Sequence, residues 1–310
     1  ATPYSAPSTP TQLSATPGNA NIALAWTASS GGGTLSYTVK RSTTSGTGFT
    51  QLATGIATPS YTDLTAINGT TYYYVVSASN QNGGTSGNSA QVSATPQGPP
   101  SQPVVAIAAY NRRLVLSWPA STGAGPITYD VQRSLSSSSG FTTIAASIST
   151  PTLSDPNLTN GTTYYYRVRA QNPVGGASTW GTQSATPENH APTLATFSTL
   201  ATAPGTALED QPYLISMGSM LAAGDEADSD GDALVFKVTS LGTGTLVRSP
   251  GGEPVTAGEV LEAGDSVVFQ GAANANGLLT AANLVAWDGE LASSTPVALR
   301  VQVTAVNDAP

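Results

Sequence analysis

The chain has 310 residues, only 9% of them charged, and a formal net charge of −8 at pH 7. Residues 1–187 carry seven bases and three acids, which gives +4, whereas residues 188–310 carry three bases and fifteen acids, which gives −12. The length predicts two or three domains, the net acidity argues against a nucleic-acid partner, and no apolar run is long enough to cross a bilayer.

Short apolar segments alternate with polar residues and are separated by Gly and Pro along the whole chain. This is the period-2 pattern of strands that bury one face. In the first part of the chain, residues 22–26 and 37–41 are predicted strands on either side of a Ser- and Gly-rich turn at 29–33. No helical repeat continues beyond two turns, so the sequence predicts an all-β fold.

An internal repeat with an offset of 92 residues covers most of residues 1–187. Trp26 recurs as Trp118, and the run Asn-Gly-Thr-Thr-Tyr-Tyr-Tyr at 68–74 recurs at 160–166. Self-similarity at a fixed spacing indicates repeated structural units. The repeat therefore predicts two homologous domains in tandem.

Both repeats resemble fibronectin type III domains, through the early tryptophan, the Asn-Gly-Thr-x-Tyr run and the spacing of 92 residues. The resemblance implies two β-sandwiches, at residues 4–97 and 98–188, each with its tryptophan buried between the sheets. It also implies that the hydroxyls of Tyr72 and Tyr164 bond back to nearby backbone, as tyrosine-corner residues do.

The two repeats end in the same tripeptide, Ala-Thr-Pro, at 94–96 and 185–187. The chain itself opens with Ala-Thr-Pro at 1–3. We interpret this opening as the tail of a further fibronectin-like unit. The chain would then be a segment of a longer array, with neighbouring domains of the same chain as its first partners.

The densest group of charges is the loop at residues 224–232, Gly-Asp-Glu-Ala-Asp-Ser-Asp-Gly-Asp. No base lies inside the loop or next to it, the nearest in sequence being Lys237. Close carboxylate pairs repel by about 1 kcal/mol even in water, so such a loop is either well solvated or gathered around a hard cation. It is not an EF-hand, because counting from Asp228 places Ala233 at the position that requires Gly and Thr239 at the position that requires Glu.

Residues 189–310 contain an early Glu209-Asp210 pair, the acidic loop, Asp288-Gly289 and a closing Asn-Asp-Ala-Pro. Through these elements they resemble the bacterial cadherin-like domains of large surface adhesins. The resemblance implies a third β-sandwich that binds calcium at its ends and thereby stiffens its junctions. The metal ligands it implies are Glu209, Asp225, Asp228, Asp230, Asp232, Asp288, Asn307 and Asp308.

The two ends of this third domain differ from each other. The linker before it reads Asn189-His190 where its end reads Asn307-Asp308, so the first junction lacks one carboxylate. We therefore expect the first junction to bind calcium weakly or not at all. At the other end, we expect a further domain to complete the site. A solvated acidic loop without metal is the alternative.

No pattern in the sequence indicates catalysis. The single histidine, His190, lies in a linker, and its sequence neighbours offer no partners for a catalytic triad. Trp180 falls outside the repeat and could be either core or an exposed sugar platform. Four further acids are flanked by Gly and Pro and are interpreted as exposed turn residues rather than a glycosidase pair: Glu253, Glu259, Glu262 and Asp265.

The sequence thus predicts three tandem β-sandwiches that form an extended rod, with calcium (Ca2+) as cofactor. The expected function is a non-catalytic structural and adhesive segment of a large extracellular bacterial surface protein. Its expected partners are cell-surface glycans or proteins, or other copies of the chain. Two other functions stay open: accessory modules of a secreted polysaccharide-degrading enzyme, and a subunit of an extracellular filament or phage tail.

Overall fold

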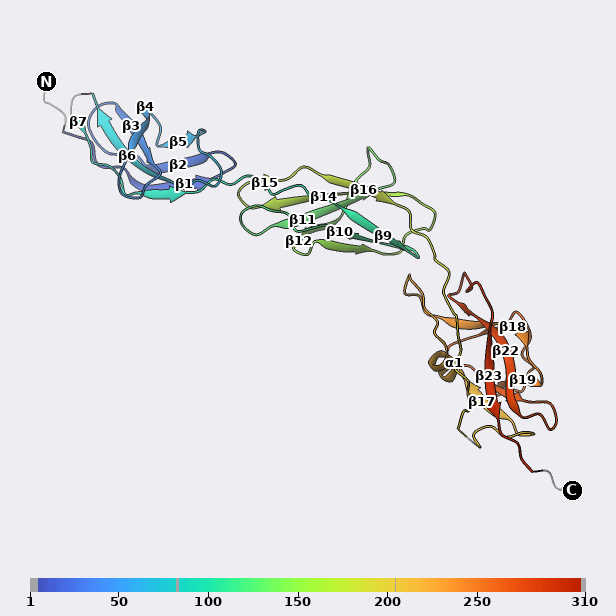
Figure 1. Ribbon diagram of the computed structural model, residues 1–310. Coiled ribbons are helices and arrows are strands. Elements are labelled where there is room, and N and C mark those ends of the chain that lie inside the picture. Colours follow the sequence, from blue (N-terminus) through green and yellow to red (C-terminus); the bar gives the residue numbers. More distant parts are fainter. Residues whose placement is uncertain (1–4, 82–83, 204, 308–310) are drawn as a thin grey trace. The chain divides into compact units, whose positions relative to one another are not determined.

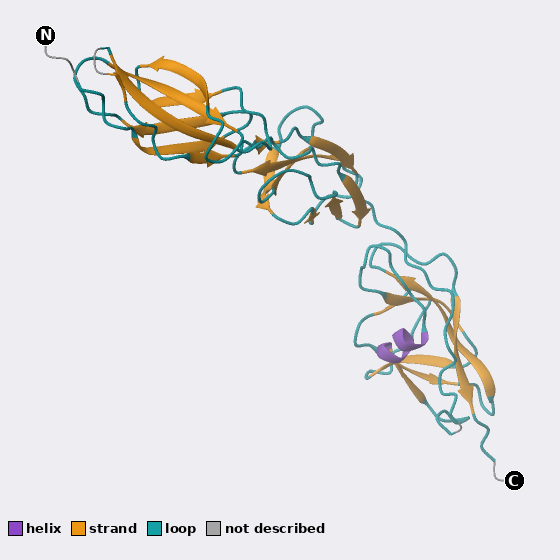
Figure 2. Cartoon of the chain, turned by 60° about the vertical axis from the view of Figure 1, so that its left-hand side comes forward, coloured by secondary structure: helices purple, strands orange, loops and turns teal. Residues whose placement is uncertain are grey.

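The computed structural model describes residues 5–81, 84–203 and 205–307. This part of the chain contains twenty-three β-strands and one α-helix, α1 (Met217–Ala223). The strands form three pairs of sheets that follow one another along the sequence (Figure 1, Figure 2). The predicted all-β fold of tandem β-sandwiches is confirmed. No helix in the described ranges has the length and apolar character needed to span a membrane.

The chain divides into two compact units. The first comprises residues 1–107, 116–154 and 163–185, and the second comprises residues 108–115, 155–162 and 186–310. Two segments of the second sheet pair thus belong to the second unit. Because this division differs from the three predicted domains, their boundaries stay predictions, as does the extended rod.

The first sandwich packs a sheet of order β1-β2-β5 against a sheet of order β4-β3-β6-β7, in which β8 also pairs with β6. Its strands are β1 (Thr11–Pro17), β2 (Ile22–Thr27), β3 (Leu35–Ser42), β4 (Thr50–Ile56), β5 (Ser60–Asp63), β6 (Tyr72–Asn80), β7 (Gly84–Thr85) and β8 (Val92–Ala94). β2 buries every second residue, as the period-2 pattern predicts.

The core of the first sandwich is built around Trp26, which is 6% exposed. The ring of Tyr37 meets it edge-on, with centroids 5.2 Å apart, a favoured aromatic geometry. The Tyr72 side chain is also buried, and its hydroxyl accepts a hydrogen bond from the backbone N–H of Ile67 at 3.2 Å. The predicted tyrosine corner of this repeat is therefore confirmed.

The second sandwich has the sheet orders β13-β10-β9 and β12-β11-β14-β15, with β16 also paired to β14. Its strands are β9 (Ala106–Tyr110), β10 (Arg113–Ser117), β11 (Thr128–Ser134), β12 (Thr142–Ile148), β13 (Thr152–Asp155), β14 (Tyr164–Asn172), β15 (Gly176–Ala177) and β16 (Gly181–Ala185). The register is that of the first repeat, since Tyr129 pairs with Ala170 as Tyr37 pairs with Ala78. Trp118 is 4% exposed, as predicted.

The repeated Asn-Gly-Thr run fixes a turn in each sandwich. The side-chain oxygen of Asn68 accepts from the N–H of Ala20 at 2.8 Å, and that of Asn160 accepts from the N–H of Arg112 at 2.8 Å. Ala20 and Arg112 both have positive φ, 54° and 51°, a conformation that costs energy for residues other than Gly. The asparagine side chains therefore hold a strained turn in place, which supports a structural role for the repeated motif.

The third sandwich packs a sheet of order β17-β21-β19 against one of order β20-β18-β22-β23. Its strands are β17 (Tyr213–Ser216), β18 (Val235–Leu241), β19 (Thr245–Ser249), β20 (Val260–Leu261), β21 (Ser266–Gln270), β22 (Gly277–Trp287) and β23 (Val297–Val303). Ser216 precedes helix α1 and caps it, its hydroxyl accepting from the N–H of Ser219, and Gly224 follows the helix as its C-cap. The acidic loop follows at once, between α1 and β18.

Candidate metal centre

Asp225, the second residue of the acidic loop, connects the loop by hydrogen bonds to the start of the third sandwich. Its Oδ1 accepts from the N–H groups of Thr196 and Ala195, each at 2.8 Å, and its Oδ2 accepts from the Thr196 hydroxyl at 3.0 Å. The hydrogen bond from the Thr196 amide is the main reason why the pKa of Asp225 lies below its ordinary value. These contacts give Asp225 a positioning role.

The next three aspartates converge on one point. One carboxylate oxygen from each of Asp228, Asp230 and Asp232 lies within 4.8 Å of the others. Asp228 Oδ1 accepts from the N–H groups of Asp230 at 2.7 Å and Asp232 at 3.3 Å, and Gly231 supplies a positive φ of 77°. This tight turn is what brings alternate side chains together. The structure therefore groups three of the eight predicted ligands.

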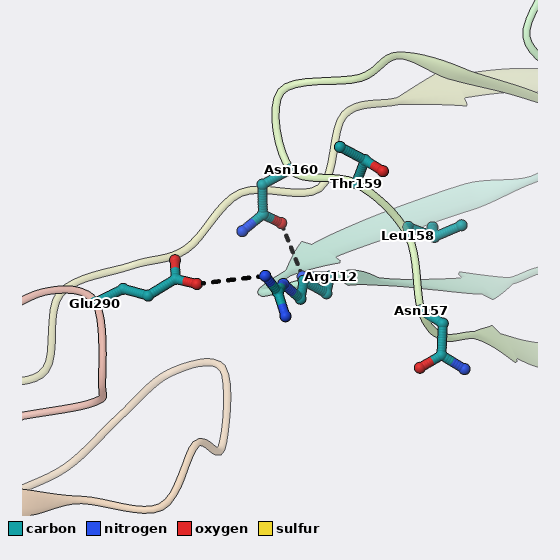
Figure 3. A pocket seen from close by; sticks show the side chains of 6 residues that line it. All are labelled: Arg112, Asn157, Leu158, Thr159, Asn160 and Glu290. Atoms are coloured by element: carbon teal, nitrogen blue, oxygen red, sulfur yellow. Dashed lines mark hydrogen bonds and ion pairs between the residues drawn. The ribbon is translucent and has the colours of Figure 1, made fainter.

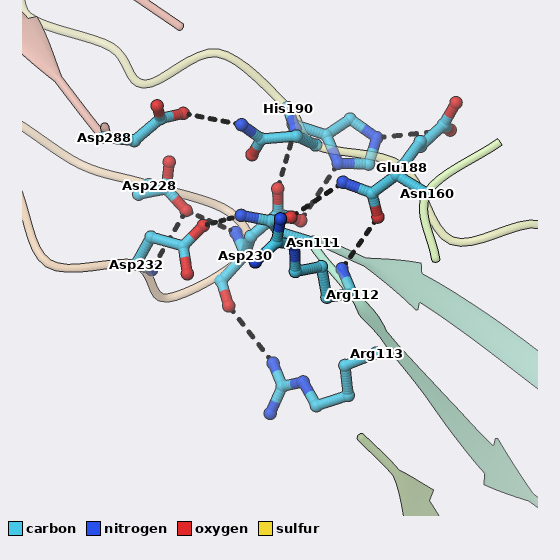
Figure 4. Close-up of polar contacts among 11 residues, drawn as sticks. Asn111, Arg112, Arg113, Asn160, Glu188, His190, Asp228, Asp230, Asp232 and Asp288 are labelled. Carbon is cyan, nitrogen blue, oxygen red and sulfur yellow. Dashed lines mark hydrogen bonds and ion pairs between the residues drawn. The ribbon is translucent and has the colours of Figure 1, made fainter. Parts of the chain in front are cut away.

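The linker before the third sandwich runs directly over this cluster (Figure 4). The N–H of His190 donates to Asp230 Oδ2 at 2.7 Å, and His190 Nδ1 lies 3.0 Å from Asp230 Oδ1. The other ring nitrogen faces Glu188 Oε1 at 3.4 Å. The hydrogen bond to Asp230 is the largest cause that raises the pKa of His190. The sequence indicated no catalytic triad for this histidine, and it did not identify these two carboxylate contacts.

Asp288 lies beside the cluster but outside it. Its Oδ1 accepts from the N–H groups of Glu290 at 2.7 Å and Leu291 at 2.6 Å, which closes the turn after β22. Its Oδ2 accepts from the side-chain amide of Asn189 at 3.2 Å. Asn189 thus joins the linker to the turn after β22, a role that the sequence did not identify. The feature of the sequence that could have pointed to this role of Asn189 is the resemblance of the linker to the end of the chain.

Residues 111–113 also contact the acidic loop, within the second compact unit (Figure 4). The Asn111 amide donates to Asp232 Oδ2 at 2.8 Å, and Arg113 donates to the backbone oxygen of Asp230 at 3.1 Å. The sequence placed no base near the loop, so the approach of Arg113 corrects that view. Because Arg113 meets a backbone oxygen, it does not neutralise the carboxylates directly.

A pocket of about 410 Å³ adjoins these residues (Figure 3). Arg112 lies in it, 3.7 Å from Glu290 Oε1, and both side chains are largely exposed. An exposed ion pair of this length contributes little to stability. Among the described residues, the pocket holds no second group of convergent metal ligands.

Three buried oxygens near the loop have no hydrogen-bond donor among the described residues: Asn189 Oδ1, Glu226 Oε2 and Asp228 Oδ2. Leaving such an acceptor without a partner costs about 1–3 kcal/mol, and more when the group is charged. Burial, followed by the charge of Asp225, raises the pKa of Glu226. Oxygen atoms that receive no hydrogen bond are suited to coordinating a hard cation such as calcium.

Glu209 lies at the opposite end of the third sandwich. Its carboxylate is buried and accepts from the side-chain amide of Asn276 at 2.8 Å and from the N–H of Val306 at 2.5 Å. Asn276 precedes β22 and Asp288 follows it. An eleven-residue strand spans roughly 33 Å, so Glu209 cannot share an ion with the cluster.

The predicted ligands therefore divide between two places. At the far end of β22, Glu209 contacts Val306, and Asn307 is the next residue in the chain. Asp308 lies outside the described residues. Asp228, Asp230 and Asp232 define the near end, with Asp288 alongside. Calcium binding at either end stays a prediction.

No protein-family model matches the chain, and neither does any curated protein. Among solved structures, an Fn3-like protein from Clostridium thermocellum is 45% identical over 29% of this chain and 92% of its own, with a TM-score of 0.27. The FN1–FN3 domains of chicken CNTN1 are 14% identical over 96% of this chain and 99% of theirs, with a TM-score of 0.33. Because both TM-scores are low, the fold assignment depends on the sheets described above and not on the alignment with these structures. These comparisons report a likeness to fibronectin type III-like proteins, which for the Clostridium thermocellum protein extends over 29% of this chain.

Proposed function

We propose that this chain is a non-catalytic structural and adhesive segment of an extracellular bacterial surface protein, and that calcium stiffens its third sandwich. The observation that carries the calcium proposal is the convergence of Asp228, Asp230 and Asp232 beside buried oxygens that lack donors. Calcium takes six to eight oxygens at about 2.3–2.6 Å. Carboxylates, an amide oxygen and water can supply such a set.

In this proposal Asp228, Asp230 and Asp232 hold the ion, and Asn189 offers its unpartnered amide oxygen. A bound cation would offset the repulsion among the carboxylates. The protein's own part is to position these groups. Asp225 fixes the loop to residues 195–196, and Asn189 connects the linker to Asp288. Calcium would thus tie three separate segments together at one end of the sandwich. This proposal differs from the weak or absent calcium binding that the sequence led us to expect at the first junction.

The His190 geometry supports the non-catalytic part of the proposal. Both ring nitrogens face carboxylates, Nδ1 facing Asp230 and Nε2 facing Glu188. A histidine that acts as a general base needs one nitrogen directed at the proton it removes. His190 instead contributes positive charge or hydrogen bonds to the acidic loop.

The adhesive role is supported by the kind of domain that the chain contains. The succession of repeated sandwiches favours a modular scaffold. Fold alone does not specify function, so the adhesive role and the extracellular location are proposals. At the far end of the third sandwich, Glu209 and Asn307 would offer oxygens to a second ion.

Calorimetry of the full chain, first with calcium and then with chelator, tests the calcium proposal. With a dissociation constant of about 0.1–1 mM, common for extracellular modules, about 10 mM calcium adds roughly 1.4–2.7 kcal/mol per site. We expect the transition of residues 189–310 to move to higher temperature. Asp230→Asn removes most of the shift, whereas Glu253→Gln, a turn residue remote from the cluster in sequence, leaves it unchanged. A transition that stays in place when calcium replaces chelator contradicts the proposal.

A further inference from the structure

The outer face of the second sandwich carries a pocket that the calcium proposal does not use. Its volume is about 250 Å³, slightly below the roughly 300–1,000 Å³ of pockets for drug-sized ligands, which suits a single sugar unit. Two half-buried aromatic rings, Phe141 and Tyr165, line it. The remaining lining is neutral and polar, apart from the buried Tyr166: Ser137, Thr182, Gln183 and Ser184.

Arg167 lies beside this pocket and is held in a fixed orientation. Its guanidinium carbon is 4.4 Å from the centre of the Phe141 ring and 4.6 Å from that of Trp180. Its Nε donates to Gln132 Oε1 at 2.7 Å. Among the described residues, no carboxylate pairs with Arg167 and nothing bonds to its two terminal nitrogens. A fixed guanidinium fork with free donors is suited to a carboxylate.

Strand pairing places Arg167 next to the polar wall of the pocket. Thr182 on β16 lies directly opposite Arg167 on β14, and Ser184 lies opposite Tyr165. The neighbouring Arg169 also contacts Trp180 but is paired with Asp130 at 2.9 Å. Among the described residues of this face, Arg167 is therefore the cation without an acidic partner. Trp180, for which the sequence left two roles open, serves here as a support for both arginines.

The first sandwich lacks this arrangement although it has the same frame. Val75 stands at the position of Arg167, and Gln91 stands at that of Thr182. The Gln91 side chain reaches across to the loop at 45–46, donating to Ser45 Oγ at 3.1 Å and accepting from the N–H of Gly46 at 2.7 Å. A glutamine thus occupies the place where the second sandwich is open. The two repeats differ in this respect by a few side chains only.

The charge of the second sandwich agrees with an anionic ligand. Residues 98–187 hold five arginines and two aspartates, a net charge of +3, in a chain whose overall charge is −8. A locally positive domain attracts anions and repels cations. The aromatic rings offer flat apolar faces beside polar groups. A ring that bears a carboxylate and several hydroxyls matches all three features.

We propose that the pocket, together with Arg167, binds a uronic-acid unit of an acidic polysaccharide. The carboxylate pairs with the terminal nitrogens of Arg167, the sugar ring lies against Phe141 and Tyr165, and the hydroxyls bond to Thr182 and Gln183. The inference rests on the adhesive part of the proposed function and names the chemistry of its ligand. It is independent of calcium, and its test is therefore made in chelator.

Titration calorimetry of the full chain with trigalacturonate tests the proposal, and the fully methyl-esterified trimer is the matched ligand without charge. We expect saturable binding of the acid and at least about tenfold weaker binding of the ester, a difference of about 1.4 kcal/mol. Arg167→Gln should weaken binding of the acid by at least about tenfold, and Arg167→Lys should weaken it less than that.

Thr182→Gln fills the pocket with the side chain that the first sandwich has, at an exposed position where folding is preserved. It should abolish binding, while Lys40→Gln, which removes a base from the first sandwich, should leave it unchanged. Equal binding of acid and ester, unaltered binding by Arg167→Gln, or equal affinity for a short peptide with a free carboxylate would each overturn the proposal. Because chelator is present, failure of sugar binding leaves the calcium proposal intact. Failure of the calcium test likewise leaves the sugar proposal intact.

Discussion

At the scale of single residues, the hydrogen bond of the Tyr72 hydroxyl should contribute measurably to the stability of the first sandwich. It accepts from the N–H of Ile67 at 3.2 Å, and the Tyr72 residue is only 4% exposed. Tyr72→Phe should lower the free energy of unfolding by about 1 kcal/mol, the size of one buried hydrogen bond. Tyr73→Phe, on the opposite face of β6, is the control and should change it much less. Chemical denaturation of both variants measures this, and equal losses would contradict the assignment.

Asp63 connects two strands of the first sandwich through its buried carboxylate. Arg41 donates to Asp63 Oδ2 at 2.7 Å, and the Tyr74 hydroxyl donates to the same oxygen at 2.7 Å. Burial by itself would raise the pKa of Asp63, but hydrogen bonds from Thr65 and Tyr74 outweigh it, and the pKa lies below its ordinary value. The ionised form is therefore the one that the fold stabilises.

This lowered pKa predicts the acid sensitivity of the first sandwich. A carboxyl with a lowered folded-state pKa stabilises the fold above its unfolded pKa, about 3.9, and the contribution is lost as pH falls through the folded value. Stability should be flat between about pH 7 and 5 and should fall below about pH 4. Asp63→Asn should be less stable at neutral pH and show a smaller fall. Denaturation across a pH series measures both, and an unchanged slope in the variant would count against this role for Asp63.

At the scale of elements, the Asn-Gly-Thr turn joins distant segments in each repeat. Asn68 accepts from Ala20 and donates to Asn19 Oδ1 at 2.9 Å. Asn68→Ala should destabilise the first sandwich by about 1 kcal/mol, because the positive-φ turn at Ala20 loses its support. Asn88→Ala removes one exposed contact with Lys40 and should have a smaller effect. Thermal unfolding compares the two, and a larger loss for Asn88→Ala would refute the argument.

The strands were predictable because each depends on a local pattern. Residues 22–26 alternate apolar and polar side chains and lie in β2, and residues 37–41 lie in β3 as predicted. The helix α1 was not predicted, since seven residues are too few to show a helical period. Its stability comes from the Ser216 cap and from burial of Met217 and Met220, which depend on tertiary structure.

At the scale of the whole molecule, the uneven charge sets the response to salt. The net charge is +4 in residues 1–187 and −12 in residues 188–310. Without calcium, raising the ionic strength should screen the repulsion in the acidic part and raise its melting temperature. With calcium bound, the same salt should have a smaller effect, and residues 1–187 should respond little in either case. Calorimetry at two salt concentrations measures this, and an equal response with and without calcium would contradict it.

The site was predictable in part, for a reason of chain geometry. Asp228, Asp230 and Asp232 converge because alternate residues on a tight turn point to one side, which their spacing already indicates. The contacts of Asn111 and Asn189 could not be predicted, because they join segments that are distant in the sequence. Asp225 belongs to the same acidic run, yet its oxygens accept from residues 195–196. Sequence alone could not separate a ligand from a positioning residue.

The central claim, that calcium gathers the acidic loop and the linker before it, is tested most directly by hydrogen exchange of the full chain, followed by mass spectrometry, in calcium and in chelator. We predict slower exchange in calcium for peptides that cover residues 186–198, 224–234 and 286–292, with no change in residues 5–81. Asp230→Asn should abolish this protection. Identical exchange in both conditions, or protection spread evenly over the chain, would contradict a calcium site at Asp228, Asp230 and Asp232.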